Sequence, residues 1–357
     1  MASLQTVSDV TPAGLARFDT IIDVRSPAEF AEDHVPGAIS LPVLSNEERA
    51  VVGTIYVQES PFKARKIGGA IVARNVAHHL DTALADKDGP FQPLVYCWRG
   101  GQRSGAMATI LANVGWRTAV LEGGYKTYRR WVQRRLYEEE LPHTLVVLEG
   151  GTGVGKTALL GLLAERGVQT IDLEGLAGHR GSLFGAIPGR EQPSQKMFES
   201  RLLGELDRLD PTRPTVVEAE SSKIGELMNP PSLWKRMTPA PRIEIIAPRS
   251  ARARYLVRAY HDVIADRPML DEAFARLPAH HGRRVLEDWA AFADAGQYEA
   301  LADQLIERHY DPAYARANRK AERPRMATLE LPDLTPNDLA RAADEIVTQI
   351  RKAFSAI

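Results

Sequence analysis

The stretch 144-TLVVLEGGTGVGKTALLGLLAE-165 decides the fold of the second half of this 357-residue chain. Residues 144–148 form a β-branched and apolar run that predicts a buried strand, and residues 158–165 have the composition of a helix. The glycine-rich segment between them satisfies the pattern G-x-x-x-x-G-K-[ST] in the setting that this pattern requires, after a strand and before a helix. We therefore expect a phosphate-binding loop (P-loop) at this position.

The predicted role of this loop is to hold a chain of phosphates. Its backbone N–H groups wrap the phosphates, Lys156 reaches the terminal ones, and the hydroxyl of Thr157 can hold Mg²⁺. The diphosphate-binding residues are expected to be Gly150, Gly151, Thr152, Gly153, Val154, Gly155, Lys156 and Thr157. Because the motif reads phosphates and not bases, a nucleotide and a diphosphate ester both fit it. Asp172 and Glu218, each at the end of an apolar run, are the candidates for holding Mg²⁺ or substrate.

Polar residues and glycines are dense in three further segments of the second half. Such segments after strands are typical of ligand-lining loops at the carboxyl edge of a parallel sheet. The candidates for a substrate loop are His179, Arg180, Ser182, Gln195, Lys196, Glu220 and Ser221.

Apolar runs alternate with helical patterns along the chain, which predicts two successive α/β units. The predicted strands of the first unit are Thr20–Val24, Pro93–Tyr96 and Thr118–Leu121, and those of the second are Thr144–Leu148, Gln169–Leu173, Thr215–Val217 and Ile243–Ile246. Pro142 breaks a charged helix, so we place the boundary between a domain at 1–138 and one at 139–357. From about residue 250 to 357 the sequence predicts helices only.

Composition limits the class of protein. With 45 basic and 46 acidic residues the chain is not a globally basic nucleic-acid binder, and its one cysteine excludes an intrachain disulfide or a multi-cysteine metal site. No apolar run is long enough to span a membrane, and the first residues lack the layout of a signal peptide. We expect a cytoplasmic protein without a membrane partner.

That cysteine, Cys97, begins a loop that runs from the strand Pro93–Tyr96 to a predicted helix at 104–114. Backbone N–H groups of such a loop, together with the helix dipole, favour an anion and lower the pKa of a thiol. Arg103 can grip an oxyanion in a bidentate manner. Cys97 and Arg103 are therefore candidate catalytic residues, with anion-binding neighbours at Trp98, Arg99, Gly100, Gly101, Gln102 and Ser104.

The first 135 or so residues resemble a rhodanese-like domain. The resemblance rests on 23-DVRSPAEF-30, 34-HVPGAI-39, the Cys97 loop and 121-LEGG-124. Arg103 lies one position later than the arginine of common sulfurtransferase loops, and its Cys-x5-Arg spacing is shared with cysteine phosphatases. The wider loop suits a phosphate-sized anion.

The combination of both loops with 179-HRGS-182, 192-QPSQK-196 and 218-EAES-221 is similar to the tRNA 2-selenouridine synthase family. The fold that this implies is α/β, with an N-terminal rhodanese-like domain and a P-loop NTPase-like parallel-sheet domain that ends in a helical region. The resemblance implies an enzyme that acts on the 2-thiouridine at the wobble position of a tRNA anticodon. It geranylates the sulfur with geranyl diphosphate and then replaces sulfur by selenium from selenophosphate.

The resemblance also implies a separate role for each of the two loops. The Cys97 loop receives selenophosphate, Cys97 either attacks or orients the selenium, and Lys156 stabilises the diphosphate leaving group. Both donors are substrates, so no tightly bound organic cofactor is expected, and an enzyme that makes selenophosphate is an expected partner. A local excess of basic residues points to tRNA contact through Arg249, Arg252, Arg254 and Arg258.

Two other functions fit the same residues. A two-domain cysteine phosphatase or kinase-like regulator would use the Cys97-x5-Arg103 loop on a phosphoester and the P-loop on ATP. A sulfur carrier that senses nucleotides would load Cys97 with persulfide and leave tRNA unchanged. The first predicts ATP hydrolysis and the second no change in tRNA nucleosides, whereas a tRNA-modifying enzyme predicts co-purification with tRNA that is lost at high salt.

Overall fold

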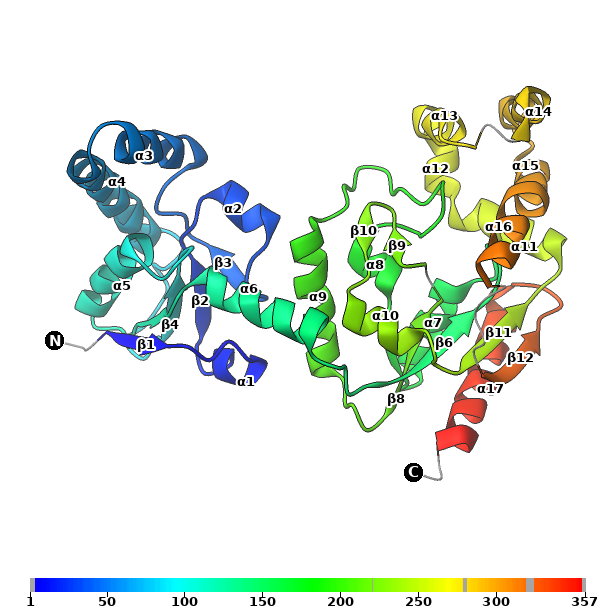
Figure 1. The fold of residues 1–357 in the computed structure, drawn as a ribbon, viewed down its shortest axis with the longest axis horizontal. Coiled ribbons are helices and arrows are strands. Elements are labelled where there is room, and N and C mark those ends of the chain that lie inside the picture. Colours follow the sequence, from blue (N-terminus) through cyan, green and yellow to red (C-terminus); the bar gives the residue numbers. More distant parts are fainter. Residues whose placement is uncertain (1–3, 220, 279–280, 319–323, 355–357) are drawn as a thin grey trace. The chain divides into compact units, whose positions relative to one another are not determined.

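The computed structural model describes residues 4–219, 221–278, 281–318 and 324–354. It divides into two units (Figure 1). One comprises the chain up to Glu138 together with Glu199–Asp207, and the other comprises Glu139–Phe198 and the chain from Arg208 on. Residues 199–207 are thus grouped with the first unit, although they follow residue 139 in the sequence.

The first unit is built on a five-stranded parallel sheet in the order β1-β5-β4-β2-β3. Its strands are β1 (Gln5–Val7), β2 (Thr20–Asp23), β3 (Ala38–Ser40), β4 (Pro93–Tyr96) and β5 (Ala119–Leu121). The fully buried pattern of β4 explains why its sequence is a continuous apolar run. A core that includes Ile22, Val95, Met107 and Leu111 joins the sheet to α5 (Gln102–Val114).

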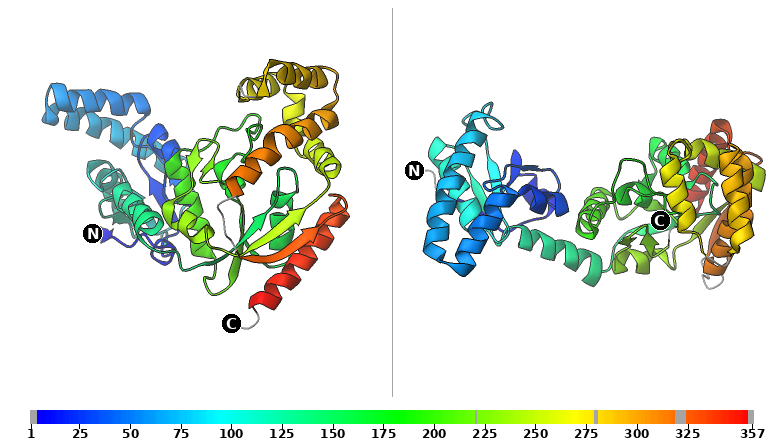
Figure 2. Two further views of the ribbon diagram at one scale, coloured as in Figure 1. Left: turned by 45° about the vertical axis from the view of Figure 1, so that its right-hand side comes forward. Right: turned by 90° about the horizontal axis from the view of Figure 1, so that it is seen from above.

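The remaining helices of this unit are α1 (Pro12–Leu15), α2 (Pro27–Glu32), α3 (Asn46–Gln58), α4 (Pro61–Asp81) and α6 (Tyr125–Gln133), which continues as a π-helix at Arg134–Glu138. Helices α3 and α4 lie side by side as a hairpin (Figure 2). Ser45 and Ser60 cap their N-termini by accepting hydrogen bonds from backbone N–H groups.

The second unit contains a parallel sheet in the order β12-β11-β6-β8-β7. Its strands are β6 (Thr144–Glu149), β7 (Gln169–Ile171), β8 (Pro214–Glu218), β11 (Arg242–Ile246) and β12 (Arg325–Glu330), and β9 (Lys223–Ile224) with β10 (Leu227–Met228) forms a separate antiparallel hairpin. The α/β class predicted from the sequence is confirmed in both units. The prediction of helices only beyond residue 250 is wrong, because β12 pairs with β11 at the sheet edge.

Helices α7 (Lys156–Glu165) and α17 (Pro336–Phe354) share one hydrophobic core with the sheet, which includes Val146, Leu160 and Ile346. The other helices are α8 (Leu173–Ala177), α9 (Gln195–Arg208), α10 (Pro231–Met237), α11 (Arg249–Ala259), α12 (His261–Ala265), α13 (Arg267–Ala275), α14 (Arg283–Asp294), α15 (Tyr298–Leu305), a π-helix at Ile306–Tyr310 and α16 (Asp311–Asn318). Several helices of the 250–310 region enclose a second core around Leu270, Trp289 and Leu301. Among the described residues, no helix is both long enough and apolar enough to cross a membrane.

Two candidate anion sites

The Cys97 loop connects the end of β4 to the start of α5. The Sγ atom of Cys97 accepts hydrogen bonds from the backbone N–H of Gly101 at 3.3 Å and from the hydroxyl of Ser104 at 3.2 Å. Burial raises the pKa of the Cys97 thiol, but the hydrogen bonds from Ser104 and from the N–H groups of Arg99 and Gly101 outweigh it, so the pKa lies below its usual value. This environment favours the nucleophilic thiolate.

Two glycines hold this loop against the turn that follows β5. At Gly124, where φ is +60°, a Cβ would lie 2.2 Å from the carbonyl oxygen of Cys97. At Gly100, where φ is +65°, a Cβ would lie 2.7 Å from the carbonyl oxygen of Leu121. The N–H of Tyr125 donates to that same Cys97 oxygen at 2.8 Å. The 121-LEGG-124 segment is therefore the back wall of the thiol loop, and no side chain fits between them.

Arg103 contacts a carboxylate in this structure. Its guanidinium donates to Glu29 of α2, with 2.7 Å between Nη1 and Oε2, and Arg49 reaches the same carboxylate at 3.2 Å. Burial raises the pKa of Glu29, but the two arginines and the N–H of Ser26 lower it to about 2. Because Glu29 accepts from both terminal nitrogens of Arg103, it competes for the guanidinium with the bidentate oxyanion contact predicted from the sequence. Arg99 is exposed and has no such partner among the described residues.

The P-loop runs from β6 to α7 and is packed against α11. Three of its glycines, Gly150, Gly153 and Gly155, have positive φ angles, which only glycine adopts readily. A Cβ on Gly153 would lie 2.8 Å from Cγ of Leu256, so the loop and α11 are in direct contact. The ammonium of Lys156 donates to the carbonyl oxygen of Gly150 at 3.3 Å, which folds this side chain back over the loop.

Two carboxylates lie at Thr157, where a metal ion would bind. The hydroxyl of Thr157 is 3.1 Å from Oε2 of Glu174 and 3.5 Å from Oε2 of Glu218, and the backbone N–H of Glu174 donates to Glu218 at 2.8 Å. Glu218 is fully buried at the end of β8. Asp172 instead caps α8 by accepting from the N–H of Gly175. Of the two predicted acids, only Glu218 reaches Thr157, and the sequence analysis missed Glu174.

These residues fit a magnesium ion that is held mainly by other ligands. No group of three or more His, Cys, Asp or Glu side chains among the described residues forms a metal site by itself. Mg²⁺ commonly takes one or two carboxylates and completes its shell with water and substrate phosphates. The hydroxyl of Thr157 and the carboxylate of Glu218 supply such a partial set.

Known protein families match this chain in two segments, one of which contains the Cys97 loop and the other the P-loop. The model of the family described as "Rhodanese-like domain" matches residues 11–130, and that of the "tRNA 2-selenouridine synthase AAA domain" matches residues 143–276. A protein from Aeromonas salmonicida named tRNA 2-selenouridine synthase is 36% identical over 323 residues, which cover 82% of this chain and 86% of the relative. The chain belongs to the tRNA 2-selenouridine synthase family.

Two other relatives of the same name match a shorter part. The Bdellovibrio bacteriovorus protein is 35% identical over 65% of this chain and 62% of its own length. The Sulfurovum protein is 37% identical over 65% of this chain and 63% of its own length. Family membership makes this chain an enzyme of tRNA modification with a rhodanese-like and a P-loop domain.

The predicted substrate-loop residues of this family member divide into two groups. Arg180 forms an ion pair with Asp262 at 2.5 Å and stacks on Tyr260, whose hydroxyl is 3.1 Å from that of Ser182. His179 is 9% exposed, its Nδ1 accepts from the N–H of Gly181, and burial lowers its pKa. Arg180 and Ser182 fasten the loop after α8 to the start of α12, whereas the hydrogen bond of His179 lies within the loop.

The second group is attached elsewhere. The amide of Gln195 exchanges two hydrogen bonds of 2.8 Å with the backbone of Met228 in β10, and Lys196 follows it at the start of α9. The hydroxyl of Ser221 accepts from the N–H of Lys223. Glu220 lies outside the described residues.

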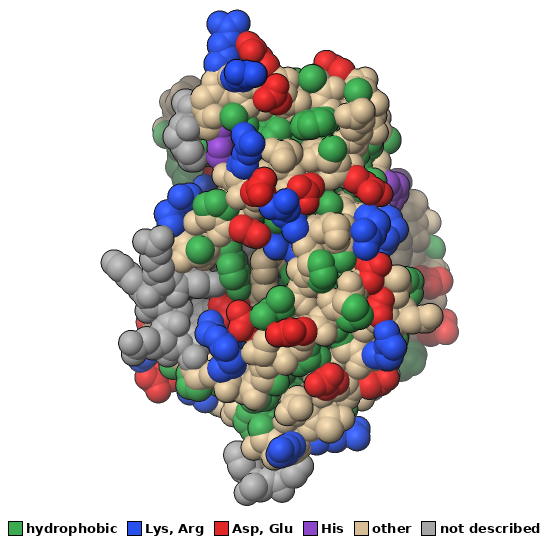
Figure 3. All heavy atoms as spheres, turned by 90° about the vertical axis from the view of Figure 1, so that its right-hand side faces the viewer, with side chains coloured by type: hydrophobic (Ala, Val, Ile, Leu, Met, Phe, Trp, Pro, Cys, Tyr) green, Lys and Arg blue, Asp and Glu red, His purple; other side chains and the backbone are tan. Residues whose placement is uncertain are grey.

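The four arginines predicted to contact tRNA are engaged within the protein. Arg249 pairs with Asp303 and Glu307, Arg252 with Asp311, and Arg254 with Asp333, and Arg258 donates to the carbonyl oxygen of Leu334. Figure 3 shows the two signs of charge interspersed over one face of the molecule. The acidic partners of Arg249 and Arg254 lie far away in the sequence and reduce the local excess of positive charge, but these two side chains remain 43% and 39% exposed, so tRNA contact through them stays a prediction.

Arg252 has a structural role beside the P-loop. Its side chain is 7% exposed, and its Nε donates to the carbonyl oxygen of Thr152 at 2.8 Å while Asp311 holds the rest of the guanidinium at 2.7 and 3.0 Å. A Cβ at Gly151 would lie 2.7 Å from this guanidinium. Arg252 thus positions the P-loop and is too buried to bind a tRNA backbone.

Proposed function

We propose that this protein converts the wobble 2-thiouridine of tRNA to 2-selenouridine in two steps, each of which uses one of the two loops. The observation that carries the proposal is the presence, in one chain of this family, of a strand-to-helix loop with a hydrogen-bonded thiol and a glycine-rich strand-to-helix loop with a lysine, both of the kind that suits an anion. The two loops suit different donors, because one offers a nucleophile and the other a cation.

In the first step the P-loop holds geranyl diphosphate. The thiocarbonyl sulfur of 2-thiouridine attacks C1 of the geranyl group, the C1–O bond breaks, and pyrophosphate leaves with the electron pair. The base loses its N3 proton. Lys156 and the loop N–H groups stabilise the charge that develops on the leaving group. A Mg²⁺ ion, when bound at Thr157 and Glu218, supplies further charge neutralisation.

In the second step the Cys97 loop holds selenophosphate. Selenium adds at C2 of the base, and the C2–S bond then breaks. The sulfur leaves as geranylthiol, which is a better leaving group than the sulfur of an unmodified thiocarbonyl. Water takes the phosphoryl group, so the products are 2-selenouridine, geranylthiol and phosphate. Cys97 contacts the selenium, and the N–H groups around it bind the phosphate oxygens. An enzyme that makes selenophosphate would supply this donor.

The test incubates the full-length protein with thiolated tRNA and both donors, and then measures the nucleosides by mass spectrometry. Cys97→Ser should stop selenium incorporation and accumulate the geranylated nucleoside, whereas Lys156→Ala should stop geranylation. Lys235→Ala is the matched control, because Lys235 is exposed and pairs only with Glu140 on the surface. If both site variants leave both steps intact, the assignment of the loops is wrong.

A further inference from the structure

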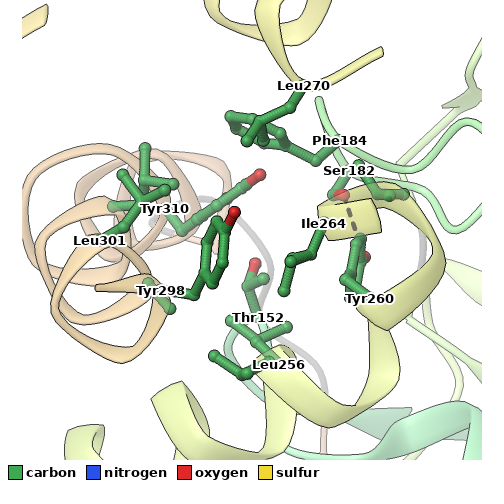
Figure 4. Close-up of a pocket in the computed structure, with 14 residues that line it drawn as sticks. Thr152, Ser182, Phe184, Leu256, Tyr260, Ile264, Leu270, Tyr298, Leu301 and Tyr310 are labelled. Carbon is green, nitrogen blue, oxygen red and sulfur yellow. Dashed lines mark hydrogen bonds between the residues drawn. The ribbon is translucent and has the colours of Figure 1, made fainter. Parts of the chain in front are cut away.

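A cavity of about 560 Å³, including its open mouth, lies beside the P-loop in the second unit (Figure 4). Thr152 of the P-loop lines one end of it, and the walls come mainly from α11, α12 and α15. The space in which the centre of a water-sized sphere fits is about 70 Å³, so the cavity is narrow and open to solvent at its mouth. An apolar recess directly beside a phosphate-binding loop is a candidate site for the part of a ligand that carries no phosphate.

The surface of this cavity is mostly apolar, although the lining residues include five with a hydroxyl group (Figure 4): Thr152, Ser182, Tyr260, Tyr298 and Tyr310. Leu256 of α11, Ile264 of α12 and Leu301 of α15 are typical of its walls, and no charged side chain is among the residues that line it. The hydroxyls of Ser182 and Tyr260 lie 3.1 Å apart and bond to each other. A nucleobase is recognised by polar groups placed around its edge, whereas this cavity offers an apolar surface. The geometry therefore favours a hydrocarbon ligand over a base.

The P-loop and the cavity form one continuous binding surface. Gly153 contacts Leu256, which is itself a wall residue, and Arg252 of the same helix holds the carbonyl oxygen of Thr152. A ligand whose phosphates lie on the loop N–H groups would direct the rest of the molecule past Thr152. In Figure 4, Phe184 and Leu270 lie at the opposite end of the cavity from Thr152 and Leu256.

We propose that this cavity binds the isoprenoid tail of a diphosphate ester whose head is held by the P-loop. The inference rests on the proposed function, because that function makes geranyl diphosphate a substrate of this loop, and it adds the residues that select the tail. Burial of the tail in an apolar cavity supplies affinity that grows with the number of buried carbons. The far end at Phe184 and Leu270 limits the length of the tail.

The experiment measures the dissociation constants of pyrophosphate, dimethylallyl diphosphate and geranyl diphosphate on the full-length protein by calorimetry. Geranyl diphosphate should bind more than about tenfold tighter than the dimethylallyl ester, which is one isoprene unit shorter. Ala302→Phe fills the cavity from α15 and should remove this difference while leaving pyrophosphate binding unchanged. Ala300→Phe makes the same change on the same helix outside the cavity and should have no effect.

Pyrophosphate binding also serves as the check that each variant is folded, and Ile264→Phe repeats the test from the opposite wall. Equal affinities for pyrophosphate and geranyl diphosphate in the unmodified protein would overturn the proposal, as would a geranyl preference that survives both wall variants. If the tail preference holds but no geranylated nucleoside forms on thiolated tRNA, the proposed function fails and the cavity assignment stands. If the geranylated nucleoside forms but geranyl diphosphate binds no tighter than pyrophosphate, the cavity assignment fails and the proposed function stands.

Discussion

The hydroxyl of Ser104 offers a direct test of how the thiol loop activates its cysteine. In Ser104→Ala the hydrogen bond to Sγ of Cys97, 3.2 Å long, is lost while the backbone N–H groups stay in place. Ser104 is fully buried, so water cannot readily replace the missing donor. Hydrogen bonds to charged groups contribute about 1.5–3 kcal/mol, and bonds to sulfur lie at the weak end. We therefore expect the pKa of Cys97 to rise, because the hydrogen bond that favours the thiolate is lost.

The direction of the pH effect follows from this change. A lower pKa keeps more of the thiol ionised at neutral pH, so Ser104→Ala should be alkylated by iodoacetamide about tenfold more slowly when the pH is below both pKa values. Above both pKa values the two rates should meet. Because Cys97 is the one cysteine of the sequence, thiolate absorbance and alkylation both report on this residue alone.

The matched control for this measurement is Thr109→Ala. Thr109 is on the same helix, and its hydroxyl donates to the carbonyl oxygen of Gly105 and not to sulfur. Its loss should leave the alkylation profile unchanged. The reasoning is refuted if Ser104→Ala titrates at the same pH as the unmodified protein, or if Thr109→Ala shifts the profile equally.

Three further outcomes are expected. Gly124→Ala should destabilise the first domain by about 3 kcal/mol or more in denaturant unfolding, because its Cβ meets a backbone oxygen at 2.2 Å, whereas Gly69→Ala, with open space around its Cβ, should not. Glu218→Gln should weaken the stimulation of pyrophosphate binding by Mg²⁺ about tenfold in calorimetry, and an unchanged Mg²⁺ dependence would exclude Glu218 as a ligand. Glu29 has a pKa of about 2 beside Arg103, so its ionised form contributes roughly 3 kcal/mol of stability above about pH 4.5, which is lost as the pH falls toward 2. The difference in thermal midpoint between the unmodified protein and Glu29→Gln should therefore shrink as the pH falls from 4.5 toward 2. A difference that stays constant with pH would show that the charge of Glu29 does not stabilise the fold.

The strands that the sequence predicts well are the buried ones. Strand β4 is apolar along its whole length and β6 between Leu145 and Leu148, because helices cover parallel sheets on both faces, and such runs stand out in a sequence. Strand β12, with the sequence RMATLE, is mostly exposed or half-buried at the sheet edge and carries no such run. Helices α3 and α4 escape prediction for a related reason, since α3 has no buried residue and α4 has only four.

In the candidate sites, too, the sequence predicts the features that are contiguous along the chain and misses those that depend on contacts between distant residues. Both loops are contiguous in sequence, so their glycines, Lys156 and Cys97 could be recognised from the pattern alone. Arg252 could not be interpreted correctly, because its partner Asp311 is 59 residues away and turns a predicted tRNA contact into a support for the P-loop. The apolar cavity depends on how several helices pack together, and no local pattern predicts it.

The claim that each loop serves its own step is tested most directly by supplying the intermediate. Lys156→Ala protein is given selenophosphate and tRNA that already carries S-geranyl-2-thiouridine, and the formation of 2-selenouridine is followed by nucleoside mass spectrometry. We expect this variant to make 2-selenouridine as fast as the unmodified protein, whereas Cys97→Ser should make none. Failure of Lys156→Ala on the geranylated tRNA, in a preparation that is folded and binds selenophosphate, would contradict the account.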